Sequence, residues 1–265
     1  MRHALTMTDA EFAAATPETV AMVPLGAMES HGPHLPIGTD TILSEAVLDA
    51  AAAALDDGTT APPVLRLPAL WLGASREHSA RAGTLSLSDA QMVEVIGAAV
   101  IGLANSGVRR VLLVNAHGGN ISLSRQAALN ARVDAGVLCA AMHWQDFGLP
   151  DQDARIPEAL RSRAAQRRDV HGGWIETSMM LAHRPELVRS PLPPGNARSA
   201  PAPSLFPVGP VHWGWMSDDL GADGYIGSPE LATAQIGQAI LEHAGAAVAQ
   251  VVRDLAAARL PASKV

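Results

Sequence analysis

The sequence predicts an α/β fold built around a mostly parallel β-sheet. Short apolar runs alternate with longer Ala-rich stretches of helical periodicity, an order typical of parallel strands joined by crossover helices. Hydrophobic residues make up 48% of the 265 residues and charged residues 17%, which argues against a disordered or fibrous chain and provides ample material for a core. The length fits one large domain, expected to cover residues 1–265.

Each expected element follows from a local pattern. The expected strands are short and apolar: 19–25 (TVAMVPL), 111–114 (VLLV) and 137–142, and residues 64–72 are expected to form an extended segment. The expected helices have apolar residues at helical spacing: 41–55, 89–106, 122–135 and 229–259. Ser88 or Asp89 suits the N-cap of the second helix, and Gly107 follows its end. Ser228 and Pro229 suit the N-cap and the first position of the last helix.

Two polar stretches interrupt this rhythm. Residues 151–169 carry five arginines, so we expect a partly helical surface segment. These arginines could bind a carboxylate or phosphate of a substrate, or could form a solvated face. Residues 189–210 contain seven prolines, which predicts a long irregular loop. Loops of this length are usually functional, flexible or packed on another subunit.

Charge and composition narrow the choice of partners. The 19 basic and 26 acidic residues give a net charge of -7 without a run of lysine or arginine, which argues against nucleic acid and favours a small molecule. No segment suits a bilayer, and residues 1–12 lack the apolar core of a signal peptide, so we expect no membrane partner. The single cysteine, Cys139, excludes an intramolecular disulfide and fits the cytoplasmic location that we expect.

The first cluster of chemically active side chains follows the strand expected at 19–25. Alternate residues of an extended chain point to the same side, so Glu29 and His31 can reach one point in space. Asp40 falls at the start of the next helix, where its carboxylate can face the same loop. Carboxylate oxygens and an imidazole nitrogen from one loop are suitable ligands for a metal ion.

A second cluster follows the strand expected at 111–114. Ligands of open parallel sheets bind beyond the carboxyl ends of the strands, which is where His117 falls. Gly118 and Gly119 come next, and glycines let the backbone approach a substrate closely and point N–H groups at it. Each of these clusters alone could be structural, but their shared position at strand ends favours a functional site.

The third cluster completes a charge argument. His171 precedes Glu176 by five residues, and both can face one cleft if a helix begins near residue 173. Glu29, Asp40 and Glu176 would then place three negative charges together, where they would repel and take up protons unless cations were present. Two divalent cations, about 3.5–4 Å apart and bridged by a carboxylate, are the arrangement that the charges favour.

The residues around these clusters form longer motifs. They comprise 25–36 (LGAMESHGPHLP), 39–40 (TD), 115–120 (NAHGGN), and His171 with 176–178 (ETS). In this order they resemble the signature blocks of the creatininase (creatinine amidohydrolase) family, and weaker echoes extend the likeness over roughly residues 20–240. The resemblance implies a three-layer α/β/α sandwich, a dinuclear site for zinc or manganese, with iron as a further possibility, and a homo-oligomer, commonly a hexamer.

Position by position, the resemblance assigns roles to these residues. It divides the metal ligands into two sets that share Asp40: Glu29 and His117 with Asp40, and His31 and Glu176 with Asp40. It makes His171 the acid or base that serves the leaving group. An ordinary imidazole pKa of about 6.5 suits either role.

One departure from the family pattern bears on the substrate. Family enzymes that act on creatinine carry Tyr-Glu at the position of Gly118 and Gly119, where the Glu is an additional metal ligand, and Trp-Asp at the position of Arg167 and Arg168. Creatinine is therefore not the expected substrate. The Gly-Gly form resembles the wider family, which includes a peptidase that matures the mycofactocin precursor, a deformylase of a formylaminopyrimidine nucleotide and a hydrolase of inositol metabolism.

Three further side chains have both a functional and a structural interpretation. His78 could contribute to the substrate pocket, and Trp144 could form a wall of the cleft, although a large aromatic side chain is more often part of a core. His34 could orient a metal ligand or simply pack within its loop.

Together these observations predict a metal-dependent amidohydrolase. We expect it to cleave a non-peptide or cyclic C–N amide bond of a small molecule with a water activated by two metal ions. The alternatives are a peptidase that trims a modified precursor peptide, a formamide deformylase and, more remotely, a non-catalytic binding protein that the metals stabilise.

Overall fold

The architecture rests on five strands in the order β1-β3-β2-β4-β5. This computed structural model describes residues 1–56, 61–196, 198, 201–202, 204–207, 211 and 213–260. The strands are β1 (Arg2–His3), β2 (Val20–Leu25), β3 (Val64–Arg66), β4 (Arg110–Asn115) and β5 (Leu138–His143). All four pairs of neighbouring strands are parallel. The predicted parallel α/β sheet is therefore confirmed.

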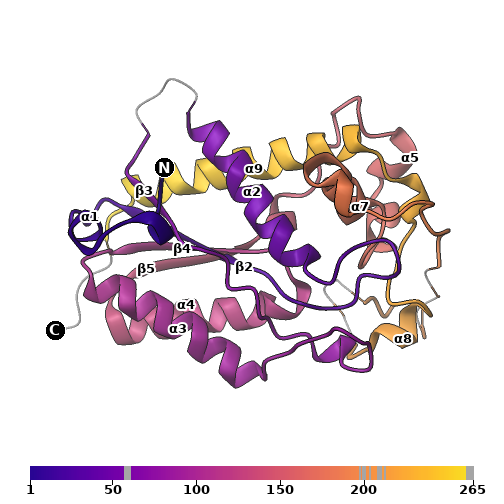
Figure 1. Ribbon diagram of the computed structural model, residues 1–265, viewed down its shortest axis with the longest axis horizontal. Coiled ribbons are helices and arrows are strands. Elements are labelled where there is room, and N and C mark those ends of the chain that lie inside the picture. The colour runs from indigo at the N-terminus through magenta and orange to yellow at the C-terminus, as the bar shows by residue number, and fades with distance from the viewer. Residues whose placement is uncertain are drawn as a thin grey trace.

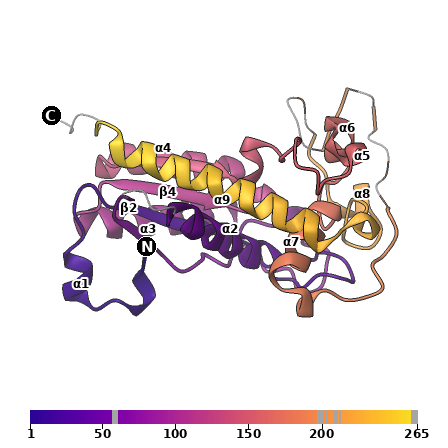
Figure 2. The ribbon, with the colours of Figure 1, turned by 90° about the horizontal axis from the view of Figure 1, so that it is seen from above.

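Helices cover both faces of the sheet. They are α1 (Asp9–Ala13), α2 (Thr39–Leu55), α3 (Asp89–Asn105), α4 (Ile121–Ala135), α5 (Glu158–Arg161), α6 (Arg163–Arg167), α7 (Trp174–His183), α8 (Ser217–Leu220) and α9 (Ala234–Ala257). Helices α2 and α9 lie on one face and α3 and α4 on the other, which gives the expected three layers (Figures 1 and 2). Within the described ranges, no helix has the length and apolarity needed to cross a bilayer.

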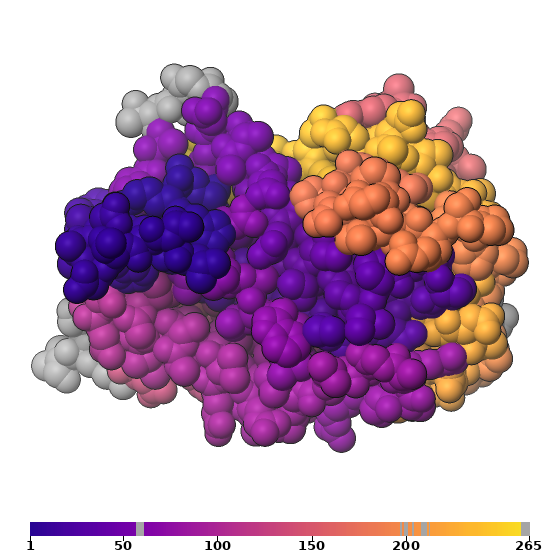
Figure 3. Space-filling view, viewed as in Figure 1, coloured from indigo at the N-terminus to yellow at the C-terminus, as the bar shows by residue number. Residues whose placement is uncertain are grey.

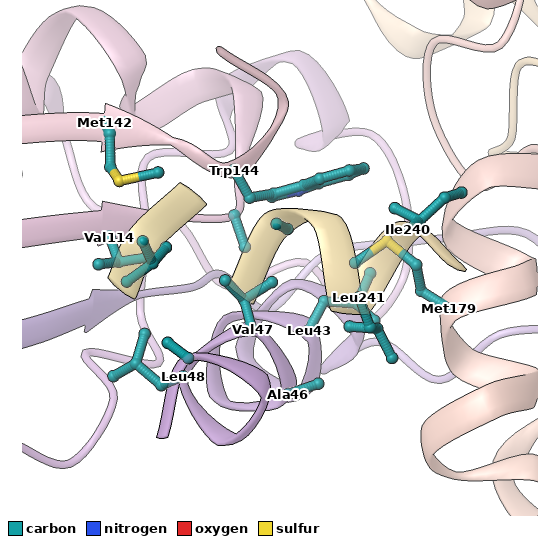
Figure 4. Packing of buried hydrophobic residues seen from close by; sticks show 14 of the residues in the cluster. Leu43, Ala46, Val47, Leu48, Val114, Met142, Trp144, Met179, Ile240 and Leu241 are labelled. Atoms are coloured by element: carbon teal, nitrogen blue, oxygen red, sulfur yellow. The ribbon is translucent and has the colours of Figure 1, made fainter. Parts of the chain in front are cut away.

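The central strands β2 and β4 are buried throughout, and they are apolar apart from the two end residues of β4, because both faces of the sheet are covered. In β2, Val20 and Met22 belong to the core cluster that includes α2, α7 and α9, whereas Ala21 and Val23 belong to the cluster with α3 and α4. The same alternation holds along β4. Strands buried on both faces are expected to form continuous apolar runs, and this is the signal that predicted them. Figure 4 shows part of the first cluster, with side chains of the sheet and of α2 gathered around α9.

Most predicted boundaries agree with the structure to within two residues, but the start of the last helix was wrong. Ser228 precedes a short 3-10 turn, Pro229–Leu231, and α9 begins only at Ala234. The side chain of Thr233 caps α9 by accepting a hydrogen bond from the Ile236 N–H at 3.2 Å. The chain therefore turns once more before the helix begins, and the side chain of Thr233, not that of Ser228, makes a capping hydrogen bond.

The two unusual stretches have the predicted character where they are described. The Arg-rich segment contains the short helices α5 and α6. No helix or strand occurs in the described part of residues 189–210. Positions 197, 199–200, 203 and 208–210 of that stretch lie outside the described residues.

Three strands end in register at one edge of the sheet. Leu25 of β2 is paired with Asn115 of β4, which is paired in turn with His143 of β5. The loops that follow these residues therefore start side by side.

Helices α7 and α8 lie toward one end of the molecule and the N-terminus toward the other (Figure 1). The space-filling view shows the indigo N-terminal segment opposite the orange segment around α7 (Figure 3).

Close helix packing fixes α2 and α7, which carry two of the predicted ligands. Both helices pack on α9, where the contact is made at glycines. A Cβ atom on Gly237 would lie 1.8 Å from the Ser178 carbonyl oxygen of α7, and one on Gly245 would lie 2.6 Å from Ala50 of α2. These backbones approach so closely that no larger residue fits without a shift of the helices.

We predict that Gly237→Ala destabilises the protein by about 1–3 kcal/mol, because α7 must move away from α9. Gly97 of α3 is the matched control, since a Cβ there meets nothing within 4 Å. Gly97→Ala should stabilise the protein by about 0.5–1 kcal/mol through the higher helix propensity of alanine. Urea unfolding of both variants measures the two values. Equal effects would contradict the close contact between α7 and α9.

Candidate metal centre

Asp40 lies at the centre of the polar cluster, in the first turn of α2. Its carboxylate is buried, and its two oxygens face different histidines. Oδ1 lies 3.2 Å from His31 Nε2, and Oδ2 lies 3.3 Å from His117 Nδ1. The structure therefore brings together the residue expected to bridge two cations and one histidine from each expected ligand set.

The loop between β2 and α2 folds back on itself to present Glu29 and His31. The Glu29 N–H donates to the Ile37 carbonyl at 2.9 Å, which closes the loop at the start of α2. The Nδ1 atom of His31 donates to the Glu29 carbonyl at 3.2 Å. This bond leaves Nε2 of His31 as the nitrogen that faces Asp40, with its lone pair free for a metal ion.

The end of β4 fixes His117 in a similar way. Asn115 donates from Nδ2 to the His117 carbonyl at 2.7 Å, and the His117 N–H donates to Asn115 Oδ1 at 3.2 Å. The Nε2 atom of the imidazole donates to the Ala74 carbonyl at 2.8 Å. Since a carbonyl only accepts, Nε2 carries the hydrogen and Nδ1 is the free nitrogen that faces Glu29 and Asp40.

Helix α7, which packs with α2 and α9 on the same face of the sheet, brings Glu176 to the cluster. Asp169 accepts hydrogen bonds from the N–H groups of Trp174 and Ile175, both at 2.8 Å, and so caps the start of the helix. Burial raises the pKa of Asp169 to about 7, against the effect of these bonds. Glu176 lies in the first turn of α7. Its Oε2 accepts a hydrogen bond from the Gly172 N–H at 2.6 Å and lies 3.8 Å from His31 Nε2.

The donor atoms form two sets that share Asp40. The first donor set is Glu29, His117 and Asp40, and the second donor set is His31, Glu176 and Asp40. His117 Nδ1 lies 3.3 Å from both Glu29 Oε1 and Asp40 Oδ2. Two ligands bound to one zinc ion at about 2.0–2.1 Å in tetrahedral geometry lie about 3.3 Å apart. The spacing in the first donor set therefore fits a shared cation.

Unpartnered oxygens give independent support for cations at this position. Both carboxylate oxygens of Glu29 and Oδ2 of Asp40 are buried and lack a hydrogen-bond partner among the described residues. A buried ionised carboxylate without a partner is strongly unfavourable. A divalent cation satisfies such oxygens directly, so the donor set fits a metal ion.

The electrostatics of the cluster show the same need for positive charge. Burial by itself would lower the pKa of His31 and of His117. The Asp40 and Glu176 carboxylates nevertheless raise the pKa of His31 to about 9, and Glu29 and Asp40 raise the pKa of His117 well above its ordinary value. Without a metal, the cluster therefore compensates its carboxylates by holding protons on the imidazoles.

His171 lies between two other imidazoles beside the first donor set. Its ring centroid is 4.0 Å from that of His31 and 4.2 Å from that of His78. Its Nε2 donates to the Ser30 carbonyl at 2.6 Å, and its Nδ1 lies 3.5 Å from Glu29 Oε1. Burial, with His31 and His78 as further causes, lowers the pKa of His171 well below its ordinary value, so the ring is neutral near pH 7.

Of the residues expected to contact substrate, His78 lies in the polar cluster, the two glycines lie at the start of α4, and Trp144 lies in the apolar core. His78 is buried in the cluster, with Nε2 3.6 Å from Glu29 Oε1. Gly118 and Gly119 form a 3-10 turn at the start of α4, with Gly118 exposed. Trp144 lies in the apolar core beside α9, only 2% exposed, and offers no surface to the cleft (Figure 4). The large apolar area of its ring is better buried there than at a polar site.

A model of the family Creatininase, described as creatinine amidohydrolase, matches residues 3–252. This chain belongs to the creatininase family. The mycofactocin precursor peptide peptidase of Mycobacterium ulcerans (strain Agy99) is 34% identical over 225 residues, which cover 83% of this chain and 78% of that relative. The creatinine amidohydrolase of Pseudomonas putida is 28% identical over 267 residues, which cover 94% and 95%.

Solved structures of family members support the same fold. A mutant creatininase of Zn-Zn type superposes with a TM-score of 0.77 at 26% sequence identity, covering 95% of this chain and 97% of the other. A creatininase designated Mn superposes with a TM-score of 0.72 at 27% identity, with the same coverage. The chain is thus a creatininase-family amidohydrolase with the family's α/β architecture.

The sequence analysis assigned no role to two acidic residues of this region, Glu77 and Asp169. Glu77 reaches the cluster from the loop before α3, with Oε1 3.8 Å from His117 Nε2. Two sequence signals pointed to it: its position next to His78, a histidine considered for the pocket, and the weaker echo of the family at Glu77-His78. Asp169 was passed over because it stands at the end of the Arg-rich stretch, and a capping aspartate five residues before the helix has no distinctive pattern.

We predict that loading of the two cations releases protons. At pH 7 the apoprotein holds protons on His31 and His117, and burial raises the pKa of Glu176 to about 7, so that this carboxyl is about half protonated. Metal binding must displace these protons, so about two to three protons should be released for two cations. Affinity should fall as the pH is lowered from about 9 to 6, because protons then compete for the same nitrogens. Calorimetric titration in buffers of different ionisation enthalpy measures the release. Binding without proton release near pH 7 would contradict the placement of the metals on these imidazoles.

Proposed function

We propose that the protein hydrolyses a carbon–nitrogen amide bond with two divalent cations held by the first and second donor sets. The observation that carries this proposal is the orientation of Asp40, whose two oxygens face separate donor sets at 3.2 and 3.3 Å. Zinc or manganese suits a mixture of imidazole and carboxylate ligands, and iron would also fit. When bound, the two cations would activate a water molecule and polarise the substrate carbonyl.

His171 has the geometry and protonation state of a base beside that position. Because Nε2 donates to the Ser30 carbonyl, Nδ1 is the free nitrogen, and it points toward Glu29 and the first donor set. A neutral imidazole can accept a proton from the attacking water at Nδ1. The imidazolium can then return this proton to the departing nitrogen, which must be protonated to leave. The close packing of His31 and His78 on the ring holds it in this orientation.

We propose a small non-peptide or cyclic amide as the substrate. The ligands of the cluster are almost entirely buried, with the side chains of Glu176 and Glu77 the more exposed ones at 14% and 22%. Such limited exposure favours a substrate whose reactive carbonyl is small and accessible. Creatinine itself is not favoured, because the positions of Gly118 and Gly119 provide no side chains to recognise it.

The second candidate is trimming of a modified precursor peptide. Its support is the 34% identity to a mycofactocin precursor peptide peptidase over most of both chains. The two metal ions would act in the same way, and only the substrate amide would differ.

Three further expectations stay predictions. They are a cytoplasmic location, a single domain over residues 1–265 and a homo-oligomer, which is commonly a hexamer in the family. Analytical ultracentrifugation measures the oligomeric state.

We predict that His171→Ala retains both metals but lowers kcat by about 10²–10⁴-fold, because the proton acceptor is lost. His183→Ala, which changes a histidine outside the site, is the control and should leave kcat unchanged. Metal analysis and steady-state kinetics on the same preparations separate the two effects. Loss of a metal from the His171→Ala protein would instead make His171 a ligand, and full activity would remove it from the mechanism.

We predict that the metal-loaded protein turns over at least one member of a panel of cyclic ureides, lactams, formamides and short peptides. Release of a new amine, followed by mass spectrometry, identifies the bond that is cleaved. Turnover of peptides alone would establish the second candidate. Absence of turnover with two metals bound would contradict the hydrolase and favour a binding protein.

A further inference from the structure

Gly119 faces a space that is already filled. A Cβ atom at this position would lie 2.1 Å from the Ala74 carbonyl oxygen, 2.5 Å from His117 Nε2 and 3.1 Å from Glu77 Oε1. Any side chain at position 119 would therefore compete with the carboxylate of Glu77 beside His117. In family enzymes that act on creatinine, the Glu expected at this position is a metal ligand, so the carboxylate of Glu77 lies next to where that side chain begins.

Glu77 is held close to the first donor set by a different part of the chain. It lies in the 3-10 turn Arg76–His78, and one ligand atom from each of Glu77, Glu29 and His117 can be chosen so that all three lie within 4.8 Å of one another. The side chain is only 22% exposed. The neighbouring Glu29 has both oxygens buried and without a hydrogen-bond partner among the described residues, and the nearest imidazole nitrogen, His117 Nδ1, lies 3.3 Å from its Oε1. The space between these side chains therefore favours a cation.

The hydrogen bonds of His117 argue against a purely supporting role for Glu77. A carboxylate that orients a metal-bound histidine usually accepts a hydrogen bond from the ring nitrogen that does not bind the metal. In this chain that nitrogen, Nε2, already donates to the Ala74 carbonyl at 2.8 Å, whereas Glu77 Oε1 is 3.8 Å away. The carboxylate of Glu77 is therefore not needed to fix the tautomer of His117 and is available to a cation.

We propose that Glu77 is an additional ligand of the cation held by the first donor set. It supplies from the loop before α3 the carboxylate that cannot be placed at Gly119 in this chain. The inference rests on the proposed dinuclear function and deepens it. A Cβ at position 119 would overlap the Ala74 carbonyl and the His117 ring and would also crowd the Glu77 carboxylate, so this chain has no room for a second carboxylate there.

The test is competition between the protein and a chelator for Zn²⁺ or Mn²⁺, with Co²⁺ absorption as a second readout. Glu77→Gln keeps the shape of the side chain and removes its charge, Glu29→Gln serves as a positive control in the same donor set, and Glu94→Gln changes an exposed glutamate of α3. Glu77→Gln should weaken one of the two binding events by more than the about 10–100-fold that loss of a merely supporting hydrogen-bond partner costs, and should leave the other unchanged. The absorption spectrum of one of the two bound Co²⁺ ions should differ between Glu77→Gln and the wild-type protein.

The possible outcomes separate this inference from the proposed function. Two unchanged affinities in Glu77→Gln, as expected for Glu94→Gln, would overturn the role of Glu77 while leaving the dinuclear site intact. Equal weakening of both binding events would also overturn it, because that result indicates a general charge effect. Fewer than two cations in the wild-type protein would contradict the proposed function itself. If Glu77→Gln does not fold, Glu77→Asp, which retains the charge but shortens the reach, should give the same selective weakening to a smaller degree.

Discussion

A single buried carboxylate, that of Asp40, links the two halves of the site. Its oxygens face His31 and His117, which follow different strands, and the remaining ligands extend these two directions. Three buried carboxylates in one cluster would be strongly unfavourable without compensating charge. The raised pKa values of His31 and His117 show that the metal-free cluster meets this need with protons. The arrangement of the remaining ligands follows from the need to place positive charge beside these carboxylates.

The fold brings the metal-binding side chains together. The register of β2, β4 and β5 brings three loop origins to one edge of the sheet. The closely packed α9 then fixes the helices that carry Asp40 and Glu176, through glycines at the points of contact. Ligands that are far apart in the sequence therefore converge through ordinary α/β packing.

How much could be predicted from the sequence depends on whether the signal is local. The strands at 20–25 and 110–115 are apolar on both faces, and Glu29, His31 and His117 follow them directly, so position along the chain sufficed to locate them. The start of α9 was misplaced because Ser228-Pro229 and Thr233 are both good start signals, and only the tertiary path of the chain decides between them.

The residues that sequence reasoning misjudged depend on packing between distant segments. Trp144 stands beside a sheet edge that carries the site, yet its ring turns into the core beside α9, and no local pattern records that choice. Glu77 becomes significant only when its loop meets the glycine at 119. Asp169 acts through N–H groups of a helix that begins several residues later. In each case the information lies in the three-dimensional neighbours.

The most direct test of the central claim is a crystal structure of the protein grown with Zn²⁺ or Mn²⁺, with anomalous diffraction recorded at the absorption edge of the metal. The account predicts two anomalous peaks about 3.5–4 Å apart, one on each side of the Asp40 carboxylate. A single peak, or metal ions bound away from Asp40, would contradict it.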